Sequence, residues 1–171
     1  MNLNKKIIAL ALASAVSTSV LATTETYNAT VIGLAEPTIA ETAALNFGTM
    51  GLVAGSSCVM DNAAVLTGDC DAADAAALAG IITISTVTAG TNLAVTVATG
   101  VGSKVTYVPT FDIAGGTANV TNAAADTPAS VTVDGTPSDI VLTLFGSMTV
   151  DTDVIAGDTE IAPYAVTVVF E

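Results

Sequence analysis

Short segments in which apolar and polar residues alternate recur along the chain, and they constrain its fold more than any other feature. In the clearest one, residues 139–150, Ile140, Leu142 and Leu144 share one face. A period of two is typical of a half-buried β-strand. Similar segments lie at 27–34, 44–47, 81–88, 92–99, 104–113, 130–133 and 164–170, separated by turn-forming Gly, Asn, Asp and Pro. The pattern predicts an all-β fold, an antiparallel β-sandwich of the Ig-like, Greek-key type with about seven to nine strands.

Residues 69–80 have a different composition. They are rich in Ala, the best helix former, with Asp69 or Asp71 as a possible start cap and Gly80 as a stop. We expect a short connecting helix there. Residues 115–128 are expected to form a long exposed loop.

The first 22 residues have the composition of a secretory signal peptide. Lys5 and Lys6 precede an apolar stretch, 7–16, and Val20-Leu21-Ala22 forms a cleavage site. The stretch is too short and too polar to span a membrane. We therefore expect residues 23–171 to be a single exported domain without an integral membrane span. It would pass through the periplasm to the cell surface or the exterior.

Acidic residues dominate the chain, with 16 Asp and Glu against 3 Lys and Arg and no His. Removal of the leader would leave Lys104 as the only base. Such a chain repels nucleic acid, because phosphate binding relies on Lys and Arg. Without His, no Ser-His-Asp or Cys-His arrangement can form. We therefore expect no enzymatic activity, no catalytic residues and no cofactor.

Two cysteines, Cys58 and Cys70, occur in this exported chain. An oxidising compartment favours a disulfide between them. A metal or redox pair is disfavoured, because the chain has no His and the spacing is not that of a CxxC motif.

Two groups of acids are candidates for holding calcium, which takes six to eight oxygen ligands. The candidates are Asp69, Asp71, Asp74, Asp151 and Asp153. Neither group matches an EF-hand loop, so solvated loops are the simpler interpretation.

Two short motifs carry a resemblance to a known family. The matching residues are Leu45, Asn46, Phe47 and Gly48, and then Tyr164, Val166, Thr167, Val168 and Phe170. In this layout the chain resembles bacterial secreted proteins of the family called domain of unknown function 4402. The resemblance implies a secreted, all-β, surface-associated protein without an assigned activity. Cys58, Cys70 and the Ala-rich stretch after them do not match the family's pattern.

The chain is also similar, more weakly, to chaperone–usher pilus subunits. Those proteins are incomplete sandwiches, with an early disulfide and a last strand that ends on a penultimate aromatic, the place of Phe170 here. Residues 23–34 would be the extension that completes a neighbouring subunit, with Tyr27, Ala29 and Val31 on one face. The alternative is that this segment is an ordinary first strand of a closed sandwich.

Together these features predict a structural cell-surface protein, a fimbria-like filament subunit assembled by β-strand complementation. Tyr27, Ala29, Val31, Tyr164, Val166, Val168 and Phe170 would form the assembly strands. Its partners would be copies of itself, other surface subunits and a periplasmic chaperone. One alternative is a soluble extracellular binding module assisted by calcium. Another is a small outer-membrane β-barrel, although 3 Tyr and 4 Phe are too few for two aromatic girdles.

Overall fold

A computed structural model describes residues 36–85, 87–134 and 139–171. All of them belong to one compact unit, bounded by Gly33 and Glu171. The expected signal peptide, 1–22, and the expected first strand, 27–34, lie outside the described residues. Within the described residues, no helix is long and apolar enough to cross a membrane.

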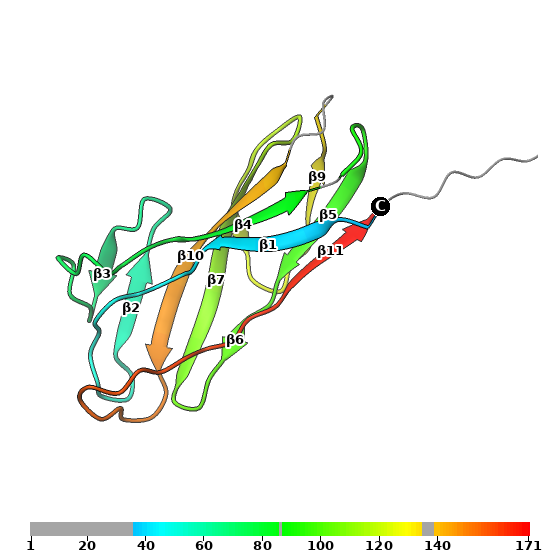
Figure 1. Cartoon of the computed structure of the whole chain (residues 1–171). Coiled ribbons are helices and arrows are strands. Elements are labelled where there is room, and N and C mark those ends of the chain that lie inside the picture. The colour runs from blue at the N-terminus through cyan, green and yellow to red at the C-terminus, as the bar shows by residue number, and fades with distance from the viewer. Residues whose placement is uncertain (1–35, 86, 135–138) are drawn as a thin grey trace, which may run out of the picture. The chain divides into compact units, whose positions relative to one another are not determined.

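Eleven strands in two antiparallel sheets, and no helix, make up the described residues (Figure 1). The strands are β1 (Thr38–Ala43), β2 (Ser57–Met60), β3 (Leu66–Gly68), β4 (Gly80–Ser85), β5 (Asn92–Val97), β6 (Gly100–Val101), β7 (Val105–Ala114), β8 (Val120–Ala124), β9 (Ala129–Thr132), β10 (Ile140–Val150) and β11 (Val166–Phe170). The prediction of an all-β sandwich is confirmed, with more strands than the pattern indicated.

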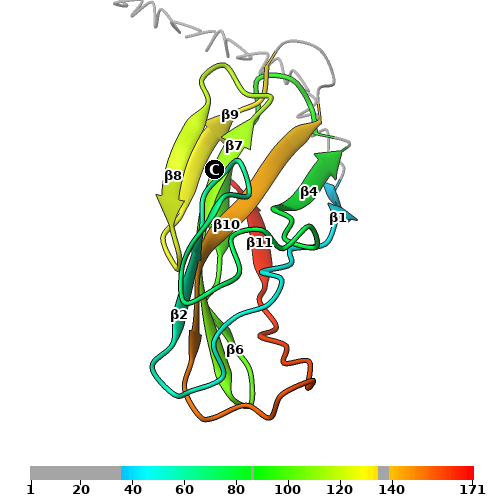
Figure 2. The same ribbon diagram turned by 90° about the vertical axis from the view of Figure 1, so that its left-hand side faces the viewer.

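The larger sheet is built around β10, its longest strand. β7 pairs with β10 along its whole length, from Val105 opposite Val150 to Ala114 opposite Val141. On its other side β10 pairs first with β4 and then with β2. Figure 2 shows β1 and β4 toward one edge of this sheet and β8 at the other.

Gly146 marks the point where β10 changes partner. Its φ is +124°, and a Cβ there would overlap the carbonyl oxygen of Val108 in β7. Only glycine adopts such a conformation without strain. The close approach of β7 to β10 therefore depends on this residue.

The smaller sheet has the order β11-β5-β9 and packs against the larger one. Leu93 and Val95 of β5 and Ile140 and Leu142 of β10 are fully buried in the core between the sheets. These side chains recur at every second position of strands rich in Val, Ile and Leu, so each strand presents a continuous apolar face. The predicted inner face of residues 139–150 is thereby confirmed.

A second apolar cluster lies beside this core and contains the disulfide. Cys58 in β2 is fully buried, and its Cα lies 5.3 Å from that of Cys70. The predicted Cys58–Cys70 bridge is thus confirmed. It ties β2 to the segment that follows β3.

The helix expected at residues 69–80 is wrong. The Asp71 carboxylate accepts a hydrogen bond from the Ala73 N–H at 3.0 Å, and the Asp74 carboxylate accepts one from the Ala76 N–H at 2.8 Å. Asp side chains that bind the backbone two residues on stabilise turns instead of helices. The local aspartates therefore override the helix propensity of alanine.

Several strands differ from the expected segments. Residues 44–47 form only an isolated bridge, at Asn46, and the strand of this region is β1, at Thr38–Ala43. The expected loop 115–128 contains β8, and β2, β3 and β6 were not expected. These strands are short and mostly lack clear alternation, so their pairing depends on neighbours that are distant in sequence.

Candidate strand-docking groove

Two edge strands from different sheets border one groove. Within the described residues, β1 pairs only with β4, and β11 pairs only with β5. Ile39 and Glu41 of β1, Ile82 of β4 and Val166 of β11 all line the groove. An edge strand presents backbone N–H and C=O groups without a ladder partner. Each of the two edges can therefore accept another strand.

Side chains on the inner faces of both edge strands are incompletely covered. Ile39 is 43% exposed, although Ile84, its partner in register on β4, is fully buried in the core. Val166, Val168 and Phe170 pack against the core but are only partly buried. Inward-facing residues of a closed sandwich are covered by the opposite sheet. The sandwich is therefore open along β1 and β11.

Hydrogen bonds at both ends of β11 show which of its backbone groups face β5. The Ala98 N–H donates to the Ala165 carbonyl at 2.8 Å, and the Glu171 N–H donates to the Asn92 carbonyl at 3.0 Å. Both are directly opposed pairs of the β11–β5 register. In an antiparallel ladder, such hydrogen-bonded pairs alternate with pairs that make no bond to each other.

This alternation assigns the remaining backbone groups of β11. Thr167 and Val169 fall on the hydrogen-bonded pairs and face β5. The N–H and C=O groups of Val166, Val168 and Phe170 therefore point to the free edge. These three residues thus combine half-buried inward side chains with backbone groups that have no ladder partner in the described part of the chain. All three were predicted as assembly residues.

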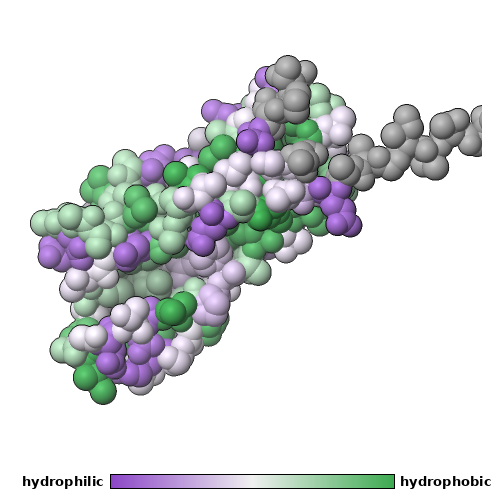
Figure 3. All heavy atoms as spheres, in the orientation of Figure 1, coloured by the Kyte–Doolittle hydropathy of each residue, from purple (hydrophilic) through white to green (hydrophobic). Residues whose placement is uncertain are grey.

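The groove continues beyond the two strands, between residues 44–52 and residues 154–164. Its volume is about 1120 Å³. Figure 3 shows it as a hollow between two ridges of the surface. At its far end, the Val154 N–H donates to the Leu52 carbonyl at 2.8 Å and joins the two walls.

Three aromatic side chains form the floor of the groove. Tyr107 lies edge-on to Phe47 and to Tyr164, with ring centroids 5.7 Å and 5.5 Å apart. The fully buried Tyr107 hydroxyl donates to the Phe145 carbonyl at 2.7 Å, next to the point where β10 changes partner. Burial raises the pKa of Tyr107, and the neighbouring Tyr164 raises it further. The two motifs around Phe47 and Tyr164 thus meet at Tyr107.

A contact between Glu41 and Tyr164 links β1 to the residues just before β11. Burial raises the pKa of Tyr164, and the charge and hydrogen bond of the Glu41 carboxylate raise it further.

The motif Leu45–Gly48 forms a tight turn in one wall. Asn46 and Leu78 exchange two backbone hydrogen bonds of 2.8 Å, and the Asn46 side-chain oxygen accepts the Gly48 N–H at 2.8 Å. Gly48 has a φ of +66°, and a Cβ there would lie 2.7 Å from a carboxylate oxygen of Asp74. The turn holds Phe47 in the floor of the groove.

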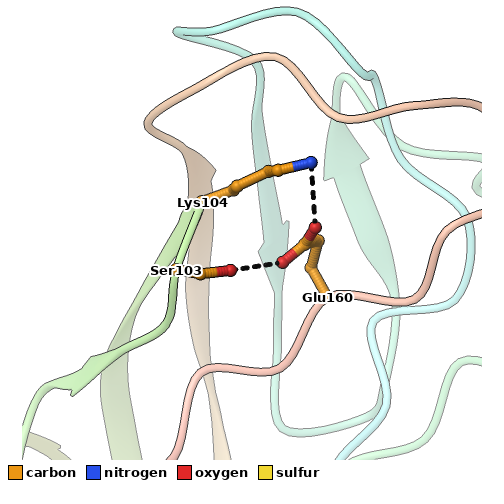
Figure 4. Close-up of polar contacts among 3 residues, drawn as sticks. All are labelled: Ser103, Lys104 and Glu160. Carbon is orange, nitrogen blue, oxygen red and sulfur yellow. Dashed lines mark hydrogen bonds and ion pairs between the residues drawn. The ribbon is translucent and has the colours of Figure 1, made fainter.

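The opposite wall is fixed by the only Lys or Arg among the described residues. The Lys104 ammonium lies 3.4 Å from one oxygen of Glu160, and the Ser103 hydroxyl donates to the other at 2.9 Å (Figure 4). The Lys104 carbonyl also accepts the Asp151 N–H at 2.7 Å. These bonds fasten residues 151–160 to the turn before β7.

The calcium candidates are Asp69, Asp71, Asp74, Asp151 and Asp153. Four of them accept hydrogen bonds from backbone N–H groups, and Asp151 accepts one from the Thr106 hydroxyl at 2.7 Å. In the described ranges, no group of three or more acidic, Cys or His side chains lies close enough to hold a metal. The geometry therefore gives the calcium hypothesis no support.

The groove also contains residues that the sequence did not point to. Tyr27, Ala29 and Val31 lie outside the described residues. Ile39 and Glu41 were not predicted, because β1 has no clean alternation of apolar and polar side chains. Tyr107 lies in a predicted strand, but nothing in its local sequence distinguishes it from an ordinary core aromatic.

No family model, no curated protein and no solved structure matches the chain. Both family resemblances therefore stay predictions.

Proposed function

We propose that the protein is a secreted structural subunit of the cell surface whose copies assemble by β-strand complementation. Residues 23–34 of one copy would enter the groove of the next. The observation that carries the proposal is the open side of the sandwich, where two edge strands border one groove and each pairs on one side only among the described residues. One additional strand would cover the exposed inner faces.

The chemistry of the groove suits an extended segment. In strand addition, main-chain hydrogen bonds supply affinity and alternate side chains fill pockets. Val166, Val168 and Phe170 offer the main-chain groups. Tyr27, Ala29 and Val31 share one face of the incoming strand and would cover the inner side chains. Until it is filled, the groove would need protection, which a periplasmic chaperone could supply.

Assembly between copies is favoured by the start of β1. A tight turn at residues 35–37 is the shortest route by which a segment could fold back onto its own β1. Glu36 and Pro37 form no turn or bend. Proline also fixes its own φ and biases the preceding residue toward extended backbone. Glu36 and Pro37 thus favour an extended entry into β1, which suits a segment that reaches a neighbouring copy.

The proposal is tested by purifying residues 23–171 and residues 35–171. The longer chain should form multimers that resist SDS. The shorter chain should stay monomeric and bind a peptide of residues 23–34. A longer chain that stays a stable monomer at every concentration would overturn the proposal.

A matched pair of variants tests the edge itself. Val168→Pro removes an N–H that faces away from β5, so the β5 ladder keeps its bonds. Val168→Ala shortens the same side chain but keeps the N–H. If β11 is the docking edge, the proline variant should fold and fail to assemble, while the alanine variant still assembles. Equal assembly of two folded variants would contradict a role for this edge.

A further inference from the structure

The lining of the groove carries negative charge only. Glu41, Asp74, Asp158 and Glu160 line it, and no Lys or Arg from the described ranges does. Lys104, the only cation among the described residues, is paired with Glu160. The groove therefore repels any incoming segment that carries acidic residues.

One segment outside the described residues fits this restriction. Residues 26–35 form an uncharged run of sequence, flanked by Glu25 and Glu36. Ten extended residues span roughly 33 Å, longer than the roughly 17 Å of a five-residue strand such as β11. The run can therefore pair with the whole edge while both flanking carboxylates stay near the ends of the groove.

The rest of an incoming subunit, in contrast to this uncharged run, is strongly acidic. Each chain has a formal charge of −13, and Lys5 and Lys6 in the expected leader account for two of its three positive charges. Docking thus places a neutral strand in the groove. At the same time it brings a strongly acidic subunit close to the carboxylates that line the groove. Like charges on approaching surfaces slow association, and mobile ions screen this repulsion.

We infer that the groove selects the uncharged residues 26–35 of a second copy, and that ionic strength controls assembly by screening the repulsion between acidic bodies. This inference rests on the proposed function. The screening length is about 30 Å at 0.01 M salt and about 8 Å at 0.15 M. Repulsion between whole subunits is thus felt in dilute buffer and is largely confined to direct neighbours at physiological salt.

The test follows multimer formation by residues 23–171 in NaCl. The rate should rise at least about tenfold between 0.01 M and 0.3 M. Asp158→Asn removes a groove carboxylate for which the structure shows no side-chain hydrogen bond, and it should speed assembly at low salt. Asp139→Asn, an equal charge change before β10 and away from the groove lining, is the matched control and should have a smaller effect.

Peptides test the selectivity of the groove separately. The monomeric residues 35–171 should bind a 23–34 peptide with Thr30→Lys more tightly than one with Thr30→Glu, with the difference shrinking at 0.3 M NaCl. Equal binding of the two peptides, or equal assembly rates at low and high salt, would overturn this inference and leave the proposed function intact. If no multimer forms at any salt concentration, the proposed function itself is overturned.

Discussion

Replacing Tyr107 by Phe isolates one hydrogen bond at the centre of the molecule. The ring contacts with Phe47 and Tyr164 would be kept, and only the bond of 2.7 Å to the Phe145 carbonyl would be lost. Because Tyr107 is fully buried, water cannot replace the lost donor. Leaving a buried group unsatisfied costs about 1–3 kcal/mol. Tyr107→Phe should therefore lower the free energy of unfolding by about that amount.

Tyr107→Ala is the companion variant. It also removes the buried ring, and large-to-small core substitutions of an aromatic typically cost about 3–5 kcal/mol. Urea unfolding of residues 35–171, followed by circular dichroism, measures both effects. If Tyr107→Phe is as stable as the unsubstituted chain, or loses as much stability as Tyr107→Ala, the hydrogen bond to the Phe145 carbonyl does not make the expected contribution.

The same side chain predicts an alkaline limit to stability. The pKa of Tyr107 is raised in the folded protein, so its contribution is present below the ordinary tyrosine pKa of about 10 and is lost as the pH rises above it. The free energy of unfolding should fall above that pH by at most about 1.4 kcal/mol per pH unit for this group. Tyr107→Phe should make the decline shallower, and an unchanged slope would contradict the assignment.

Three further predictions concern the disulfide, Gly146 and two hydrogen-bonded aspartates. The double variant Cys58→Ala, Cys70→Ala removes the bridge between residues 12 apart in sequence. It should lower the free energy of unfolding, measured in urea, by about 3 kcal/mol. No loss would mean that the bridge does not constrain the unfolded chain. Gly146→Ala should lower the free energy of unfolding by at least about 1–3 kcal/mol. The loss should exceed that of Gly90→Ala, because Gly90 has a φ of +78° but no atom lies within reach of a new Cβ there. Equal losses for the two variants would contradict the close approach of β7 to Gly146. Hydrogen bonds lower the pKa of Asp74 and Asp126 in the folded protein, so the free energy of unfolding should fall as the pH drops below about 4. Asp126→Asn should weaken this pH dependence, which is measured as the melting temperature at a series of acidic pH values.

The sequence was most informative where one strand buries one face. The alternation in residues 139–150 predicted β10 and its inner residues, because a period of two leaves a single arrangement compatible with a core. The Cys58–Cys70 bridge was equally predictable, since two cysteines in one chain allow a single intramolecular pairing.

Local composition misled where side chains compete with the backbone. The alanines after Asp71 favour a helix, but each Asp bonds to the N–H two residues on and forms a turn. Intrinsic propensity is a weak prior that such contacts override. The turn at Asn46 shows the same effect in a segment expected to be a strand.

The groove could be predicted only in part. The final strand and its inward residues followed from alternation in residues 164–170. The contribution of β1 did not, because Ile39 and Glu41 belong to a strand that is exposed on both faces. Phe47 and Tyr164 both contact Tyr107 because strands that are distant in the sequence pair in the sheets. A single sequence does not specify that pairing.

Amide hydrogen exchange in β11 measures directly whether a strand docks on this edge. Residues 35–171 would be measured by NMR with and without a peptide of residues 23–34. The N–H groups of Thr167 and Val169 face β5 and should exchange slowly in both samples. Those of Val166, Val168 and Phe170 should exchange fast alone and become protected when the peptide binds. Fast exchange at these three residues with the peptide bound would contradict strand addition at β11.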